Sequence, residues 1–264
     1  TTVSFEEVSN LETIGTSAFQ GATGLTSVTI PKSVTSIGDS AFLGATGLTT
    51  VSFEEVSNLE TIGTSAFEDA GLTSITIPKR VTSIGTRAFW SATSLTEVSF
   101  NNIDNSKLLT IGDGAFNNTR FTSFTIPATV TSIGNAAFQS ATSLAYITIP
   151  AGVTSIGKNT FYRAHSLTEV EFATDGSLNS IGNTAFKDAK MLTSITIPAG
   201  VTSIGTDAFS DAARLTEINV DGSNSDFSSR NGVLFNNDYT SLMKYPEGKL
   251  DTSYNIPTGV TNIK

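Results

Sequence analysis

The residues that could carry catalysis are few. His165 is the only histidine, so a Ser-His-Asp arrangement would have to use it. It follows Arg163-Ala164, where several equivalent segments have Thr, and this position is more typical of a solvated surface side chain than of a general base. The motifs G-x-S-x-G and H-E-x-x-H are absent from the sequence, and no G-x-x-x-x-G-K is followed by the Ser or Thr of a phosphate loop. We therefore predict that the protein is not an enzyme.

Groups that could hold a metal ion or a cofactor are equally sparse. The pairs Glu6-Glu7 and Glu54-Glu55 place adjacent side chains on opposite sides of an extended segment, which makes them poor acid–base partners. The oxygen-rich run from Asp221 to Asp226 lacks the D-x-[DN]-x-[DN]-G spacing of a calcium loop, so we interpret it as a polar turn and leave Ca²⁺ open. The chain has no cysteine, which excludes disulfides and thiolate metal sites. We expect no cofactor.

A repeated unit organises the whole chain. The 19 residues Thr1–Phe19 recur unchanged at Thr49–Phe67. A shorter unit of the form I-G-x-x-A-F recurs with its Ile at 14, 37, 62, 84, 111, 133, 156, 181 and 204. Successive copies begin 22 to 27 residues apart, and periods of 20–29 residues with a strand-like apolar triplet are typical of leucine-rich repeats.

Each repeat predicts a strand followed by a short helical turn. In Leu25–Ile30 the apolar Val28 and Ile30 alternate with polar neighbours, which is the period of a half-buried strand, and a Pro often ends it. The residue after Ile-Gly is Thr, Asp or Asn in every copy except that of Lys158, and these types cap helix N-termini. The following Phe side chains should stack as one buried column, at 19, 42, 67, 89, 116, 138, 161, 186 and 209.

The exposed positions of the predicted strands differ along the chain. Parallel strands lie about 4.8 Å apart, so equivalent positions form columns. In the first strands these columns hold almost only Ser and Thr, which support the sheet but distinguish partners poorly. Charged and aromatic residues enter later, and we take them as the candidate binding surface: Glu97, Tyr146, Glu169, Glu171 and Glu217.

The pattern L-x-x-[VI]-x-I-P-x-x-V-x-x-I-G-x-x-A-F closely resembles the BspA-like leucine-rich repeats. That family usually has Cys three residues after the Phe, where this chain has Ala in eight copies and Thr119 in the ninth. The resemblance covers residues 1–220 as nine units, and residues 221–264 look like the family's variant unit, with a β-hairpin around Asn236–Asp238 and the start of a further repeat. The expected fold is a right-handed solenoid with a parallel sheet on one face and short helical turns on the other.

The resemblance implies a secreted or cell-surface protein that binds proteins of the host matrix or of neighbouring cells. The chain has 15 Lys and Arg against 24 Asp and Glu, which argues against nucleic acid and anionic membranes as partners. No apolar run approaches the roughly 18 residues of a membrane span. Both ends fall within repeats, so we expect a monomeric fragment of a longer protein. A structural stalk that carries another domain stays open as the alternative function, and an ice- or carbohydrate-binding Ser/Thr array is a remoter one.

Overall fold

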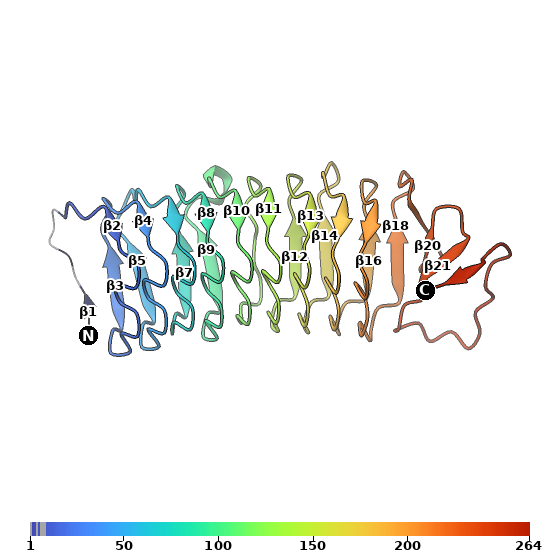
Figure 1. Cartoon of the computed structure of the whole chain (residues 1–264), viewed down its shortest axis with the longest axis horizontal. Helices are drawn as coiled ribbons and strands as arrows, with labels where there is room; N and C mark the ends of the chain where they lie inside the picture. The colour runs from blue at the N-terminus through green and yellow to red at the C-terminus, as the bar shows by residue number, and fades with distance from the viewer. Residues whose placement is uncertain (1, 4, 6–8) are drawn as a thin grey trace.

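The chain forms a stack of similar coils along one long axis (Figure 1). The computed structural model describes residues 2–3, 5 and 9–264, and the Glu6-Glu7 pair and the strand position of Ser4 lie outside these residues. Each coil runs from a four-residue strand, through a connector and a two-residue strand, to the turn that contains Ala-Phe. This order positions the same residue of every repeat at the same place in its coil.

The strands are short and nearly all are parallel. Their bounds are β1 Thr2–Val3, β2 Thr13–Ile14, β3 Ser27–Ile30, β4 Ser36–Ile37, β5 Thr50–Phe53, β6 Thr61–Ile62, β7 Ser74–Ile77, β8 Ser83–Ile84, β9 Glu97–Phe100, β10 Thr110–Ile111, β11 Ser132–Ile133, β12 Tyr146–Ile149, β13 Ser155–Ile156, β14 Glu169–Phe172, β15 Ser180–Ile181, β16 Ser194–Ile197, β17 Ser203–Ile204, β18 Glu217–Val220, β19 Phe227–Arg230, β20 Val233–Asn236, β21 Ser241–Lys244 and β22 Asn262–Ile263. One 3₁₀ helix, η1 at Ile103–Asn105, lies in a long connector.

The predicted four-residue strands are confirmed, and they pair in the expected register. Ser27 pairs with Thr50 and Thr50 with Ser74, while Tyr146 pairs with Glu169 and Ser194 with Glu217. The apolar residue between the two exposed positions is buried in every one of these strands. Alternating burial therefore puts one row of side chains into the core and leaves the other row on the surface.

This strand face is divided into three hydrogen-bonded segments, with the orders β1-β3-β5-β7-β9, β12-β14 and β16-β18. The first interruption falls at residues 121–126, where only an isolated bridge joins Ser123 to Tyr146. This coil has Phe121 and Phe124 where other repeats have Leu and Val or Ile. Both rings are buried, so their greater bulk coincides with the break in the strand ladder.

A second parallel sheet, which the sequence analysis did not foresee, runs along the side formed by the two-residue strands. These strands pair in the orders β11-β10-β8-β6-β4-β2 and β13-β15-β17. In every coil after the first, the Gly that follows the two-residue strand is needed because the coils approach closely there. A Cβ on Gly134 would lie 2.4 Å from the backbone nitrogen of Asp113, whereas a Cβ on Gly15 in the first coil would meet nothing within 4 Å.

The prediction of short helical turns around Ala-Phe is wrong. Two residues in each of these segments have positive φ, as Ser17 (57°) and Gly21 (68°) do in the first coil, and a right-handed helix requires negative φ throughout. The segments are successive tight turns. Every second N–H group donates to a carbonyl of the next coil, and the N–H groups between them donate three residues back within the same coil. The Phe19 N–H donates to Ala41 O of the next coil at 2.7 Å, while the Ala22 N–H donates three residues back to Phe19 O at 3.1 Å.

The expected helix caps also have another role. The Asp39 Oδ1 accepts a hydrogen bond from the Thr64 N–H at 2.7 Å, and Asn183 Oδ1 accepts one from the Thr206 N–H at 2.9 Å. In both pairs the donor stands at the same position of the following coil. The Asp and Asn side chains predicted to cap a local helix therefore join neighbouring coils instead.

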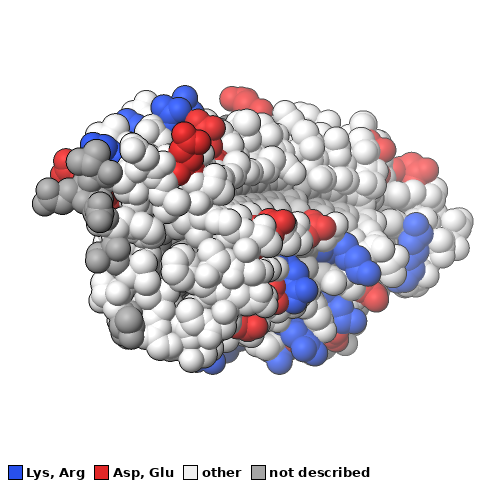
Figure 2. Space-filling view, turned by 60° about the vertical axis from the view of Figure 1, so that its left-hand side comes forward, with Lys and Arg blue, Asp and Glu red and all other residues white. Residues whose placement is uncertain are grey.

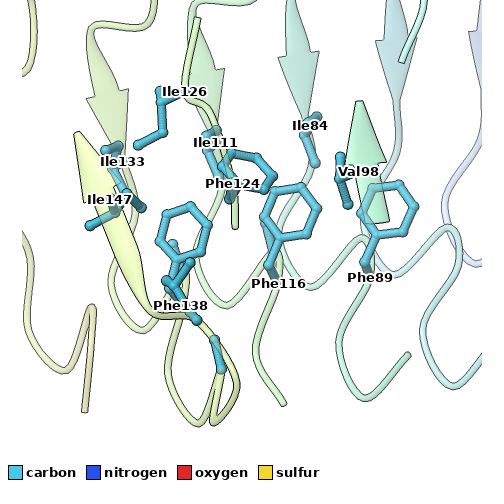
Figure 3. Packing of buried hydrophobic residues seen from close by; sticks show 14 of the residues in the cluster. Ile84, Phe89, Val98, Ile111, Phe116, Phe124, Ile126, Ile133, Phe138 and Ile147 are labelled. Atoms are coloured by element: carbon cyan, nitrogen blue, oxygen red, sulfur yellow. The ribbon is translucent and has the colours of Figure 1, made fainter. Parts of the chain in front are cut away.

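The predicted Phe column is confirmed and forms the centre of the core. Successive rings are stacked with centroids 5.1 to 5.8 Å apart, from Phe19 to Phe209. Figure 3 shows Phe89, Phe116 and Phe138 pointing from the turns toward the Ile and Val side chains of the two sheets. Ala at the position before each Phe leaves room for this close stacking, and where Thr160 replaces it, its hydroxyl donates to Gly157 O at 3.0 Å.

The last part of the chain replaces the regular coil with antiparallel strands. The hairpin expected around Asn236–Asp238 is formed by β20 and β21, and β19 pairs with the other edge of β20. The Ile218 N–H donates to Gly232 O at 2.9 Å, which attaches this unit to the preceding strand. The chain then returns to the parallel arrangement where β21 pairs with β22.

Candidate functional site on the strand face

The structure brings three of the five predicted binding residues together on β12 and β14. Tyr146 pairs with Glu169 and Thr148 with Glu171 in the strand register, so all four side chains share one exposed area. The Tyr146 hydroxyl donates to Glu171 Oε2 and lies 2.6 Å from Thr148 Oγ1. The Thr148 hydroxyl lies 3.3 Å from the same carboxylate oxygen. We call Tyr146, Glu169 and Glu171 the Tyr–Glu cluster.

Electrostatics in this cluster favour a neutral phenol beside an acceptor carboxylate. The hydrogen bond to Glu171 raises the pKa of Tyr146 above 10.0, and the hydrogen bond to Thr148 opposes this shift. The ring remains 40% exposed, so its face is open to a partner. Tyr146 therefore holds Glu171 in place and still offers an aromatic surface.

Glu169 and Glu171 also border a shallow recess of about 300 Å³. The half-buried Phe172 and Pro198 and the exposed Asp221 complete much of its lining. Among the described residues, the Glu169 carboxylate has no hydrogen-bond partner. The recess thus combines an apolar floor with three acidic side chains, which suits a long cationic side chain whose stem is apolar.

The other two predicted residues lie apart from this cluster. Glu97 is exposed on β9, on the far side of the irregular coil at residues 121–126. Glu217 is exposed on β18, with Ser194 of β16 between its strand and that of Glu169. Its carboxylate accepts a hydrogen bond from Asn219 Nδ2 at 3.3 Å. The five residues therefore form one cluster and two separate acidic positions.

The Ser and Thr residues of the earlier strands support the sheet, as the sequence analysis proposed. Hydroxyl groups on neighbouring strands contact each other, with 2.9 Å between Thr29 and Ser52 and 2.9 Å between Thr76 and Ser99. A further Thr at the strand entry donates to a backbone carbonyl of the preceding coil, as Thr49 does to Thr26 O at 3.2 Å. Much of the Ser/Thr content thus has a structural explanation.

The remaining candidates for chemistry lie elsewhere. His165 Nε2 is 3.1 Å from Asp188 Oδ2 on the turns, and Arg163 and Lys190 also pair with Asp188. In the Asp221–Asp226 run, Asn224 is buried and its side-chain oxygen accepts the N–H groups of Asp226 and Phe227. This arrangement is that of a packed turn.

Other surface features were missed by the sequence analysis. A groove of about 510 Å³ lies between the long connectors after β5 and β9, with Val51, Glu55 and Asn102 in its lining. The groove arises because the short connector after β7 lies between the two long connectors. The alternating lengths of the repeats in the sequence could have indicated it. Within the described residues no group of three His, Asp or Glu side chains could hold a metal ion, and none of the helices there is long and apolar enough to cross a membrane.

Comparison with known proteins agrees with this architecture. The sequence model of the BspA type leucine rich repeat region, in 6 copies, matches residues 4–108 and 109–239. A search of curated proteins gives no significant match.

Several solved structures are similar to the chain. The pneumococcal vaccine antigen PcpA is 20% identical, with a TM-score of 0.46 over 90% of this chain and 74% of that one. A leucine rich cell surface protein from Faecalibacterium prausnitzii is 23% identical, with a TM-score of 0.43 over 96% and 83%. The T. pallidum leucine rich repeat protein is 25% identical, with a TM-score of 0.49 over 71% and 74%. Because the family model covers most of its length, the chain belongs to the BspA-type leucine-rich-repeat family.

Proposed function

We propose that this chain is a non-enzymatic protein-binding module of a secreted or cell-surface leucine-rich-repeat protein. Its partners are proteins of the host matrix or of a neighbouring cell surface, and nucleic acid and membrane insertion have no part in its activity. The observation that carries the proposal is the Tyr–Glu cluster, an aromatic ring and two carboxylates on a face otherwise rich in Ser and Thr. The location rests on the resemblance to secreted and surface-anchored BspA-like proteins.

The chemistry of the cluster selects a partner with exposed Lys or Arg. A cation can lie over the Tyr146 ring and donate charge-assisted hydrogen bonds to Glu169 or Glu171. Glu171 is already held by Tyr146 and Thr148, so binding needs little further ordering of that side chain. Such pre-organisation reduces the entropy lost on association.

The binding test compares two triple variants of the strand face. We expect Tyr146→Ala with Glu169→Ala and Glu171→Ala to weaken adhesion to immobilised laminin, to collagen or to intact epithelial cells. A loss of at least tenfold in affinity, about 1.4 kcal/mol, would fit the removal of a small binding centre. Biolayer interferometry and a cell-adhesion assay measure the effect.

The matched control carries three substitutions on the uniform part of the same face, Thr29→Ala, Thr50→Ala and Ser52→Ala. We expect it to keep most of the binding, because these hydroxyl groups contact one another rather than present distinctive chemistry. Equal losses in both variants, or no loss in either, would contradict the proposal. The turn side of the molecule, where Trp90 and Tyr162 each follow the Phe of their repeat, or the structural stalk would then be favoured.

A structural stalk remains the second candidate function. It is supported by the unbroken column of stacked Phe rings, which links the coils into one rod, and by the uniform Ser/Thr surface of the first strands. A stalk predicts that replacing the exposed residues of β12 and β14 leaves adhesion unchanged.

A further inference from the structure

In the C-terminal half of the solenoid, up to residue 227, the basic residues are confined to the turns, where Asp188, Asp207 and Asp211 also lie, while the strands and connectors are acidic. Within residues 134–227, all of which the structure describes, every Lys and Arg stands on the turns, at Lys158, Arg163, Lys187, Lys190 and Arg214. In the same range every charged residue of the strands and connectors is acidic, at Glu169, Glu171, Asp175, Glu217, Asp221 and Asp226. In Figure 2 Lys and Arg gather along the lower part of the molecule, beside acidic side chains.

This separation is confined to that half of the molecule. In the N-terminal half the connectors themselves carry Lys32, Lys79, Arg80 and Lys107, and a connector ion pair joins Arg80 to Glu60 at 3.0 Å. The connectors there hold both signs of charge. The charge-separated surfaces are therefore a local feature and not a consequence of the repeat itself.

Four of these basic residues lie on the turns of two adjacent coils, and we call them the basic turn surface (Lys158, Arg163, Lys187 and Lys190). The Arg163 N–H donates to Lys187 O of the next coil at 3.0 Å, so these two residues are neighbours. Asp188 lies among them, 3.7 Å from Arg163 Nε and 3.5 Å from Lys190 Nζ. The Lys158, Arg163 and Lys190 side chains are exposed. Asp188 and Asp211, the second of which lies 3.5 Å from Lys187 Nζ, offset two of the four positive charges.

We propose that the strand face around Glu169 and Glu171 docks onto the basic turn surface of a second copy of this chain. Both surfaces lie on the same neighbouring coils, whose strands are about 4.8 Å apart, and within residues 134–227 the turns are net positive whereas the strands and connectors are acidic. Two copies with parallel axes can therefore place Glu169 and Glu171 of one against the basic turn surface of the other. The proposal rests on the proposed function, because it names the chain itself as the Lys- and Arg-bearing partner of the Tyr–Glu cluster.

The net charge of −9 does not prevent this contact. At physiological ionic strength charges are screened over about 8 Å, so groups in the contact dominate over charges at the far end of the rod. The two surfaces are different, which makes the interface heterologous. Such contacts extend into open chains of molecules unless the rotation between copies closes a ring.

The test uses sedimentation velocity of the purified chain at increasing concentration. We expect the sedimentation coefficient to rise with concentration in about 0.05 M salt and to return to the monomer value in about 0.5 M salt, where the screening length falls from roughly 14 Å to roughly 4 Å. No foreign protein is present, so failure here leaves the proposed binding to matrix proteins testable on its own.

Two charge reversals then identify the surfaces. The variant with Glu169→Lys and Glu171→Lys and the variant with Lys158→Glu and Lys190→Glu should each be monomeric alone. Their equimolar mixture should associate again. The reversed strand face of the first variant complements the reversed turn surface of the second, and the native strand face of the second complements the native turn surface of the first. Circular dichroism and melting temperature confirm that both are folded. The control with Lys79→Glu and Lys107→Glu, on connectors of the other half, should associate like the unaltered chain.

Three outcomes would overturn the proposal. The unaltered chain could stay monomeric at low salt, as the sequence analysis predicts. The mixture of reversed variants could fail to associate although both are folded. A monomeric chain could also bind a heparin column through Lys158 and Lys190, which would assign the basic turn surface to an anionic polysaccharide.

Discussion

The phenol of Tyr146 gives a spectroscopic measure of the binding cluster at the scale of a single residue. Its hydrogen bond to Glu171 raises its pKa above the ordinary 10.0. We expect Glu171→Gln to lower that pKa toward 10.0, because the negative acceptor is gone. Tyrosinate absorbance with pH measures the shift, and Tyr146→Phe identifies the transition that belongs to this residue. An unchanged titration in Glu171→Gln would show that the two side chains do not interact in solution.

The direction of the pH effect on stability follows from the same hydrogen bond. The pKa of Tyr146 is raised in the folded chain, so the neutral phenol is the form that folding favours. Its contribution is complete below the unfolded pKa and is lost as pH rises through the folded pKa. Any loss therefore lies above pH 10, and the cluster keeps its geometry at physiological pH.

A buried Phe in the middle of the column should matter most for stability. The Phe138 ring stacks on Phe116 at 5.7 Å and on Phe161 at 5.6 Å. We expect Phe138→Ala to lower the free energy of unfolding by about 3–5 kcal/mol, and urea denaturation measures it. Phe19→Ala is the control, since its half-buried ring stacks on Phe42 alone among the described rings. Equal losses in both would mean that the column is not the centre of the core.

At the scale of the coil, the Ile-Gly pair sets how closely neighbours approach. A Cβ on Gly134 would overlap the Asp113 backbone, so Gly134→Ala must push two coils apart. We expect it to destabilise the fold by about 1–3 kcal/mol, as overpacking does. Gly15→Ala, at the same motif position but with nothing within 4 Å, should be close to neutral. The difference in urea midpoint between the two variants tests this, and a neutral Gly134→Ala would contradict the close approach.

The elements differ in how far the sequence could predict them. Strands such as β3 could be predicted from the local alternation of apolar and polar residues. The register of the strands and the Phe column could be predicted from the regular spacing of the repeats. The turns did not, because Thr, Asp and Ala favour a capped helix locally. Their N–H groups instead find acceptors in the next coil, and a partner more than twenty residues away leaves no local signal.

The candidate site shows the same limit. Its columns could be predicted, since Tyr146 and Glu169 stand at equivalent positions of neighbouring repeats. The hydrogen bond from Tyr146 to Glu171 crosses diagonally to the adjacent column and depends on the reach of the side chain, which spacing does not specify. The break in the ladder at residues 121–126 had a signal in Phe121 and Phe124, but their effect depends on how the core accommodates them.

At the scale of the whole molecule, stability should depend on contacts between neighbouring coils. Deleting residues 112–133 joins Ile111 to Gly134 and removes the irregular coil without changing the I-G junction. We expect the shortened chain to unfold in one cooperative step, with an m-value lower by about a tenth because less surface is exposed on unfolding. Separate unfolding transitions for the parts before and after the deletion would contradict this. They would show that the irregular coil couples the two parts and that the new contact between its neighbours does not.

The ring-to-ring distance in the Phe column has a consequence for reach. Neighbouring rings are 5.1 to 5.8 Å apart, so each coil adds no more than that to the axis, and it uses at least 22 residues to do so. The same 22 residues would extend about 33 Å as an α-helix. This architecture therefore gains little length per residue, and what each added coil contributes instead is perimeter: one more set of side chains on every side of the rod. Natural variation in coil number should accordingly change how many contact positions the protein displays far more than how far it projects.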